Sequence, residues 1–288
     1  MTDFVQIVLS GAVVGVLYAL LSAAYAIVYA GTGFVNFSFG ALAVLAGYFG
    51  YVAMPGSAIE SRALVALVVV APISVGAWLL VFEPIVRRSP VAGVISAFAL
   101  AIVIQEAVAF TAGNVPRSAD SPFGSGLERV GGVVMSHHAM GVLLVGGVLL
   151  AATIIAFSTR SADVLKAVHQ DREMAMLLGV RARRVALGVT VCAGVLVVVA
   201  GVLAPPAFGL TPYVGTSMGL VAFVGAVLGG LDRVGTAVAG SLILGVAESL
   251  FGGYISSDLR TAFVFGVFIL VLIVRPVGLF VGATKQKV

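Results

Sequence analysis

The sequence contains eight apolar runs, most of them about as long as a helix that crosses a membrane. About 20 apolar residues span the roughly 30 Å hydrocarbon core of a bilayer. The runs are 4–30, 34–53, 63–82, 91–111, 139–157, 185–204, 235–251 and 261–274. A ninth run, 216–230, is shorter and crosses only if it is tilted or broken. The runs lack the alternating polarity of transmembrane barrel strands. They therefore predict an all-α, polytopic integral membrane bundle of about eight to ten transmembrane helices.

The composition excludes a soluble globular protein. Only 10% of the residues are charged and 61% are hydrophobic, with a mean hydropathy of +1.19, whereas soluble domains carry about 25% charged residues. No basic residue precedes the first apolar run and no small-residue cleavage site follows it, so this run is expected to be a span and not a signal peptide. The single cysteine, Cys192, excludes disulfides within the chain.

The basic residues predict an orientation in the membrane. If the loop 158–184 and the C-terminus are cytoplasmic, twelve of the sixteen Lys and Arg residues lie inside. The outside then holds Arg62, Arg117, Arg129 and Arg260. This division follows the positive-inside rule. It requires nine crossings and places the N-terminus outside. Because the charges fall in short loops between spans, the net charge of +4 does not indicate a nucleic-acid partner.

Glycine is enriched, and two segments interrupt the apolar pattern. Small residues let helices approach closely in lipid, and Gly33, Gly40 and Gly47 recur every seven residues, which predicts one shared helix face. Polar residues and prolines break the pattern at 31–40 and 205–212. Such breaks are typical of transporters, where they occur at equivalent points of two repeated halves. A shift of 179 residues aligns Val35, Ser38, Gly40 and Ala43 with Val214, Ser217, Gly219 and Ala222. The sequence thus predicts pseudo-repeated halves with broken helices.

Missing motifs exclude several function classes. None of the three lysines, Lys166, Lys285 and Lys287, follows a glycine, so the chain has no phosphate-binding G-x-x-x-x-G-K-[ST] loop and is not an ATPase. Only Glu106 and Glu248 are acidic residues within spans, which is few for an ion-coupled carrier. No catalytic constellation, cofactor motif or metal-ligand cluster is present. The chain is expected not to be an enzyme.

The loop 158–184 is the longest predicted cytoplasmic segment. Asp171 suits the N-cap of a short helix, and Gly179 suits the left-handed position after its end. These two residues predict a helix over 172–178, either as a docking element or as part of an ordinary connecting loop with solvated charges.

At this loop the sequence resembles a known family. The spacing Glu173-x-Ala175-x-x-x-Gly179 is similar to the E-A-A-x-x-x-G loop of ABC importer permeases, which seats in the ATPase subunit. The stretch from 165–168 to 178–180 resembles the same loop in the branched-chain amino-acid permease family, although Arg172 replaces the usual proline and Met174 the middle alanine. The resemblance implies that Asp171, Arg172, Glu173, Ala175 and Gly179 couple the permease to an ATPase.

Further blocks extend the resemblance along nearly the whole chain, as a single domain over 1–288. The block 31–40 resembles the family's first block, in the shorter of its two permease types. The glycine-rich stretch 227–248 and the ending 275–280 also match. Ser38 and Phe39 stand where the family often has Ala and His, and Asp232 and Arg233 replace small residues.

The resemblance implies a permease subunit of an ABC importer in a bacterial or archaeal inner or plasma membrane. Its implied partners are cytoplasmic ATPases, a second permease subunit, identical or not, and an extracytoplasmic solute-binding protein. Alternating access would move a small solute, with a branched-chain amino acid expected and urea or short amides as alternatives. A stand-alone secondary transporter or channel is the alternative function.

Asn36 and Ser38 are predicted to line the translocation path. A buried amide or hydroxyl without a partner is costly in hydrocarbon, so both side chains should face protein or water. In a regular helix the two would point about 200° apart, so both can line one path only where the backbone is broken. The alternative is that Asn36 bonds a neighbouring helix or caps the second span.

Overall fold

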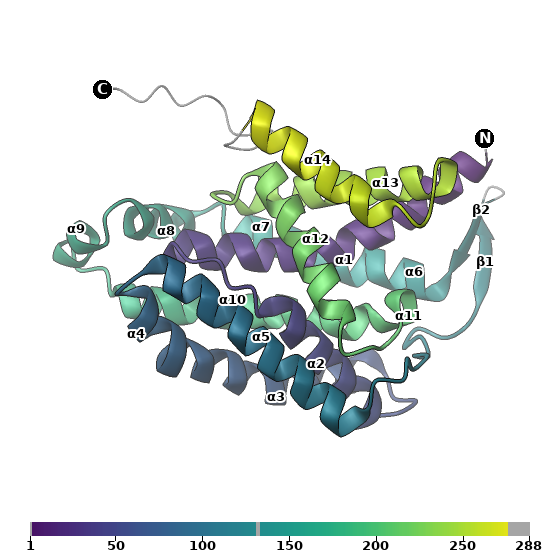
Figure 1. Cartoon of the computed structure of the whole chain (residues 1–288), viewed down its shortest axis with the longest axis horizontal. Helices are drawn as coiled ribbons and strands as arrows, with labels where there is room; N and C mark the ends of the chain where they lie inside the picture. The colour runs from purple at the N-terminus through teal and green to yellow at the C-terminus, as the bar shows by residue number, and fades with distance from the viewer. Residues whose placement is uncertain (1, 131–132, 276–288) are drawn as a thin grey trace.

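The computed structural model describes residues 2–130 and 133–275, and this part of the chain is almost wholly helical (Figure 1). The helices are α1 (Thr2–Thr32), α2 (Phe39–Val52), α3 (Ile59–Ala77), α4 (Glu83–Val86), α5 (Pro90–Ala112), α6 (His137–Gly141), α7 (Gly147–Ala156), α8 (Arg160–Gln170), α9 (Arg172–Leu177), α10 (Ala182–Leu203), α11 (Pro205–Phe208), α12 (Val214–Gly229), α13 (Val234–Tyr254) and α14 (Arg260–Val274). π-helical turns over Trp78–Phe82 and Val142–Gly146 join α3 to α4 and α6 to α7. Strands β1 (Leu127–Val130) and β2 (Val133–Ser136) form an antiparallel hairpin.

Six of the described helical segments are long and apolar enough to cross a membrane. They are Asp3–Thr32, Ile59–Val86, Pro90–Ala112, His137–Ala156, Ala182–Leu203 and Val234–Tyr254. Three shorter apolar helices, Phe39–Val52, Val214–Gly229 and Arg260–Val274, fall on the remaining apolar runs. The prediction of a polytopic helical bundle is confirmed.

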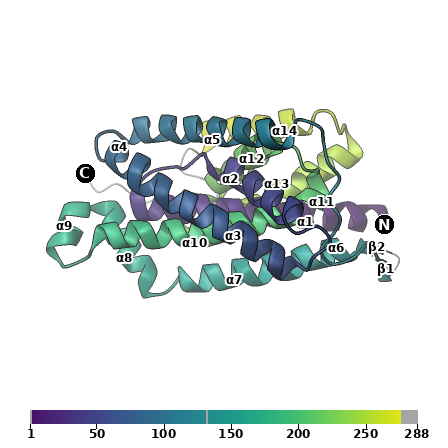
Figure 2. The ribbon, with the colours of Figure 1, turned by 90° about the horizontal axis from the view of Figure 1, so that it is seen from below.

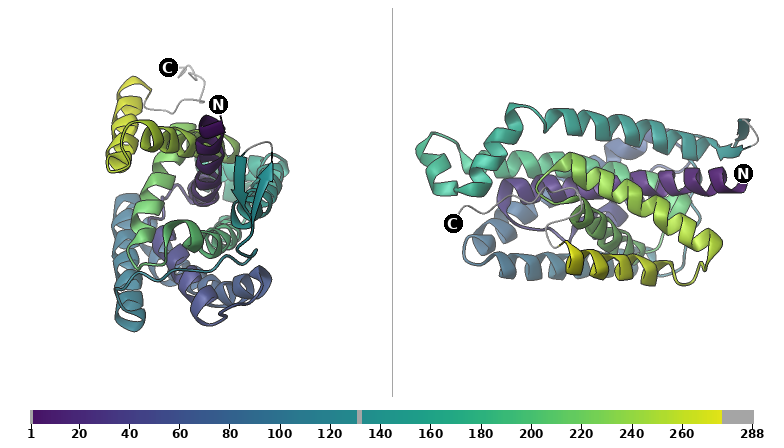
Figure 3. Two further views of the ribbon diagram at one scale, coloured as in Figure 1. Left: turned by 90° about the vertical axis from the view of Figure 1, so that its right-hand side faces the viewer. Right: turned by 90° about the horizontal axis from the view of Figure 1, so that it is seen from above.

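Helix α1 is the central element of the bundle. It packs against α10, α12 and α13, and its middle, which includes Leu17, Leu21 and Tyr25, is fully buried. The α8–α9 segment projects beyond the bundle at one end, and the N-terminus and the β1–β2 hairpin lie at the other (Figures 1 and 3). Helix α10 starts at the α9 end, so it runs antiparallel to α1 (Figure 2).

The two halves of the chain repeat one packing pattern. Helix α1 belongs to the first half of the chain but packs on α12 and α13 of the second half. Helix α10 belongs to the second half but packs on α2 and α3 of the first half. The two short helices, α2 and α12, pack against each other between these layers. Gly40 and Gly219, which the 179-residue shift aligns, meet at this crossing. Together with the antiparallel α1 and α10, this exchange is the arrangement expected of an inverted repeat.

Both predicted breaks, at 31–40 and 205–212, occur in the structure. The first break also corrects the prediction about Gly33. Helix α1 ends at Thr32, and Gly33 follows it with a left-handed φ of 68°. The seven-residue spacing predicted that Gly33, Gly40 and Gly47 share one helix face. This prediction is wrong for Gly33, which lies in the linker. Within α2, Gly40 faces α12, and Gly47 faces the carbonyl oxygen of Gly201 on α10.

We expect Gly40→Ala to destabilise the protein. A Cβ at Gly40 would lie 2.9 Å from the carbonyl carbon of Gly215 and 3.2 Å from the Cα of Gly219, and overpacking of this kind costs about 1–3 kcal/mol. Gly188→Ala is the matched control, because this helical glycine has nothing within 4 Å of its Cβ position and gains helix propensity of about 0.5–1 kcal/mol. Apparent melting temperatures in detergent test the pair. Equal stability of the two variants would contradict a tight α2–α12 crossing.

Candidate functional site

Helix α9 is a short, capped helix at the tip of the α8–α9 segment, as the sequence predicted. The Oδ1 of Asp171 accepts a hydrogen bond from the backbone N–H of Met174 at 2.9 Å. At the other end, Gly179 has a φ of 88°, and the N–H of Val180 donates to the carbonyl of Ala175 at 3.0 Å. These bonds satisfy both ends of the helix locally, so its shape is set by its own sequence.

The side chains of α9 divide into an anchoring face and an exposed face. Ala175 is buried in a small cluster with Val168 of α8 and Ala182 of α10, so it faces its own chain. The exposed side chains described on α9 and at its C-cap are apolar. They are Met174, Met176, Leu177 and Leu178, which the motif-based prediction did not name. The side chains of Arg172 and Glu173 lie outside the described part of the structure.

Helix α8 was not predicted, although it connects α9 to the bundle. Its Leu165 packs where α1 and α10 meet, close enough that a Cβ on Gly31 would lie 3.2 Å from the Leu165 Cδ2 and 2.9 Å from a methyl group of Val189. The α8–α9 segment is thus anchored to the last turn of α1, directly before the first break.

A buried carboxylate ties two further elements together at the same end of the bundle. Glu83 of α4, about 8% exposed, accepts from Arg87 at 2.5 Å and from Arg183 of α10 at 3.2 Å. Because Arg183 lies in the first turn of α10, this pair connects α4 to the point where the chain returns from α9.

The first break is held by hydrogen bonds among its own residues and the end of α1. The Oγ1 of Thr32 donates to the carbonyl of Val28 at 2.6 Å. Asn36 and Ser38 lie in the linker and are both buried, and the Asn36 Oδ1 accepts from the N–H of Ser38 at 3.1 Å and from its hydroxyl at 2.6 Å. The two side chains therefore bond to each other directly before α2 begins.

The second break is held by a backbone pair. Pro205 and the following residues form the single turn α11, and Gly209 then adopts a φ of 75°. Arg117 and Leu210 exchange backbone hydrogen bonds of 3.1 and 3.0 Å, and the Tyr48 hydroxyl also donates to the Leu210 carbonyl at 3.4 Å. Residues from three distant parts of the chain thus fix the approach to α12.

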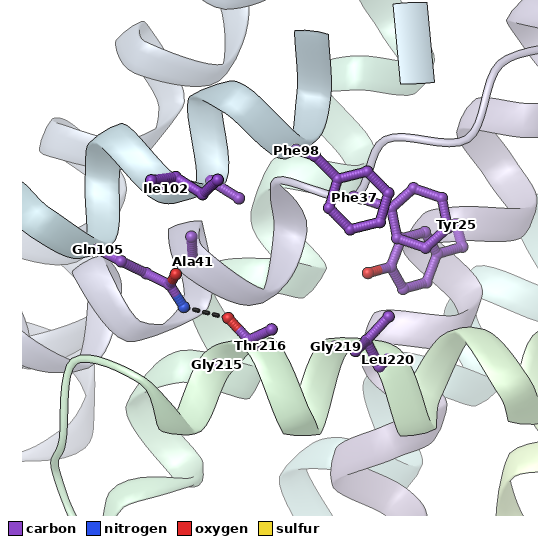
Figure 4. Close-up of a pocket in the computed structure, with 11 residues that line it drawn as sticks. Tyr25, Phe37, Ala41, Phe98, Ile102, Gln105, Gly215, Thr216, Gly219 and Leu220 are labelled. Atoms are coloured by element: carbon purple, nitrogen blue, oxygen red, sulfur yellow. Dashed lines mark hydrogen bonds between the residues drawn. The ribbon is translucent and has the colours of Figure 1, made fainter. Parts of the chain in front are cut away.

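A pocket lies where the two broken segments face α5 (Figure 4). Its volume is about 380 Å³, counted with the space at its mouth. Phe37 of the linker and Phe98 of α5 stack with their ring centroids 4.4 Å apart, and Gln105 of α5 donates to the hydroxyl of Thr216 on α12. Tyr25 of α1 completes the wall. The sequence prediction did not name these residues, because the fold alone brings them together.

Comparison with known proteins identifies the family. Residues 7–272 match the family model described as "Branched-chain amino acid transport system / permease component". The chain belongs to this family. It is 29% identical to the high-affinity branched-chain amino acid transport system permease protein LivH of Escherichia coli K12 over 99% of this chain and 98% of LivH. It is 27% identical to BraD, a permease protein with the corresponding description from Pseudomonas aeruginosa, with the same coverage.

A solved structure shares the fold. PsaBC from Streptococcus pneumoniae, in complex with Fab, matches with a TM-score of 0.50 and 12% sequence identity over 91% of this chain and 90% of that chain. Family membership confirms that the chain is a multi-pass membrane permease component and not itself an enzyme.

Proposed function

We propose that this chain is the permease subunit of an ABC importer that moves a branched-chain amino acid across the inner or plasma membrane of a bacterium or archaeon. The family match over residues 7–272 carries this proposal, and relatives named as branched-chain amino acid permeases, aligned over nearly their full length, support it. Residues 1–288 act as one domain. The partners are cytoplasmic ATPase subunits, a second permease subunit and an extracytoplasmic solute-binding protein. Hydrolysis in the ATPases drives alternating access.

Uptake by the assembled complex tests the proposed function. Proteoliposomes for this test contain this chain, its second permease subunit and its ATPases. We expect them to accumulate labelled leucine only when ATP is present on the side of the membrane that carries the ATPases and solute-binding protein is present on the opposite side. A stand-alone carrier or channel would instead pass leucine with this chain alone and without ATP. Labelled urea and acetamide serve as competing substrates, and preferential uptake of either would contradict the amino-acid assignment.

We assign ATPase coupling to the segment 158–184, and within it to Asp171, Arg172, Glu173, Ala175 and Gly179. The capped geometry of α9, its place at the tip of the molecule and its exposed apolar residues support this role, because an apolar helix face that is free of its own chain suits insertion into a groove of a partner. Asp171, Ala175 and Gly179 would act by holding α9 in shape, while its exposed face makes the contact.

We expect Gly179→Arg to uncouple transport from ATP hydrolysis. A side chain at a φ of 88° is strained, so the end of α9 should unwind while the bundle stays folded. Solute-stimulated ATP hydrolysis should fall by more than tenfold at an unchanged melting temperature of the permease. Gly56→Arg is the matched control, since Gly56 also has a left-handed φ, 70°, and nothing within 4 Å of its Cβ position, but lies in the loop between α2 and α3. Normal stimulated hydrolysis in Gly179→Arg would contradict the assignment.

We propose that Asn36 and Ser38 line the translocation path when the halves move. The break in which they lie and their burial inside the bundle support this role. Their mutual hydrogen bonds equally suit the alternative role, a cap on α2. Replacement of each residue by Leu should lower leucine uptake at matched membrane abundance if the path runs here. Unchanged uptake in both variants, together with a lower melting temperature, would leave only the capping role.

We propose that the N-terminus lies outside and the C-terminus in the cytoplasm. The division of basic residues supports this orientation, as does the placement of the β1–β2 hairpin beside the N-terminus and of α9 at the far end (Figure 1). A cysteine at Ser125 should react with an impermeant thiol reagent in intact cells. A cysteine at Leu178 should react only after the membrane is opened. The opposite pattern would reverse the topology.

A further inference from the structure

The pocket between α1, α2, α5 and α12 holds a polar group that has no partner. Tyr25 is fully buried, and its hydroxyl makes no hydrogen bond within the described residues. Figure 4 shows this hydroxyl directed across the pocket toward Gln105 and Thr216. A buried hydroxyl without a partner weakens a fold. The Tyr25 hydroxyl is therefore a liability unless another molecule bonds to it.

The opposite wall offers further hydrogen-bonding groups. The bond from the Gln105 amide nitrogen to the Thr216 hydroxyl leaves the amide oxygen free to accept. Thr216 lies in the first turn of α12, where the N-terminal end of a helix favours a negative group. Three polar side chains from three helices thus converge on one space.

The remaining walls of the pocket are apolar. The stacked rings of Phe37 and Phe98, with Ile102 beside them, form one side of the pocket. None of the described residues that line the pocket is charged.

We propose that this pocket is a solute-selecting site within the permease, in addition to any selection by a binding protein. Tyr25, Gln105 and Thr216 bind the polar head group of the solute, and the Phe37–Phe98 pair packs against its aliphatic branch. Because the walls carry no charge, a zwitterion with its charges balanced enters at lower cost than a solute with a net charge. The site thus accepts leucine, isoleucine or valine and excludes lysine and glutamate. This inference rests on the proposed function.

Protection from alkylation measures binding at the pocket directly. Leu220 lines the pocket, so the double variant Cys192→Ser, Leu220→Cys places a single thiol there in the assembled complex. Leucine should slow the reaction of this thiol with N-ethylmaleimide, whereas lysine and glutamate should not. In the wild-type complex, the permease's only thiol is Cys192, which is exposed and does not line the pocket, and leucine should not affect its labelling.

Tyr25→Phe separates a binding role from a structural one. Loss of a hydrogen bond to a charged head group should raise the half-protecting leucine concentration roughly tenfold and lower the rate of leucine uptake. Because the hydroxyl has no protein partner, the melting temperature should stay the same or rise. Tyr48→Phe is the matched control: its buried hydroxyl has a partner, the Leu210 carbonyl, so the melting temperature should fall and leucine protection should not change.

The outcomes distinguish this inference from the proposed function. The wild-type complex could take up leucine with ATP while leucine fails to protect Leu220→Cys and Tyr25→Phe transports normally. These results would refute leucine binding at the pocket and leave the proposed function standing. Protection by lysine or glutamate equal to that by leucine would overturn the selectivity. Protection by leucine without any leucine uptake would refute the proposed function and leave the binding site in place.

Discussion

A chain that interrupts its helices inside a membrane protein must satisfy the freed backbone groups internally, because lipid offers no hydrogen bonds. Both breaks of this permease obey that constraint. The first relies on nearby side chains: the Thr32 hydroxyl donates to the Val28 carbonyl, and the Asn36 Oδ1 accepts from the Ser38 N–H. The second relies on distant residues, since Leu210 pairs with Arg117 and receives the Tyr48 hydroxyl. The short helices α2 and α12 exist because these breaks are stable.

The glycine contacts follow from the same breaks. Since α2 and α12 begin inside the bundle, their first turns lie side by side, and Gly40, Gly215 and Gly219 let the two backbones touch. Each half of the pseudo-repeat supplies one of these helices. The pocket next to the crossing is consequently built from both halves, with Phe37 from the first and Thr216 from the second. Any movement of one half relative to the other changes its shape.

Features that depend on local sequence could be predicted, and features that depend on tertiary contacts could not. The long apolar runs predicted the long helices. Asp171 and Gly179 predicted α9, because the caps of a helix depend on only a few residues. The prediction that Gly33 shares a helix face with Gly40 and Gly47 is wrong, because Gly33 adopts a left-handed φ and ends α1. The spacing of glycines in the sequence does not indicate the backbone conformation at any one of them. Three features could be found only in the three-dimensional structure. They are helix α8, the Glu83 ion pairs and the Tyr25 hydroxyl, which has no hydrogen-bond partner among the described residues. Glu83 meets Arg183 a hundred positions further along the chain, and no local signal marks such a pair.

The anchoring of α8 places the proposed coupling segment against the end of α1 that leads into the proposed selection site. Leu165 packs beside Gly31 of α1. Gly31 lies six positions before Phe37, which stacks on Phe98 in the pocket wall. Between them Gly33 ends the helix with a left-handed φ of 68°, so a displacement of the last turn of α1 reaches Phe37 through non-helical backbone and not through a continuous helix. Spatial continuity alone does not establish coupling. It does specify the element that would have to adopt two arrangements. That element is the linker 33–38, because it joins the anchored end of α1 to Phe37 in the pocket wall.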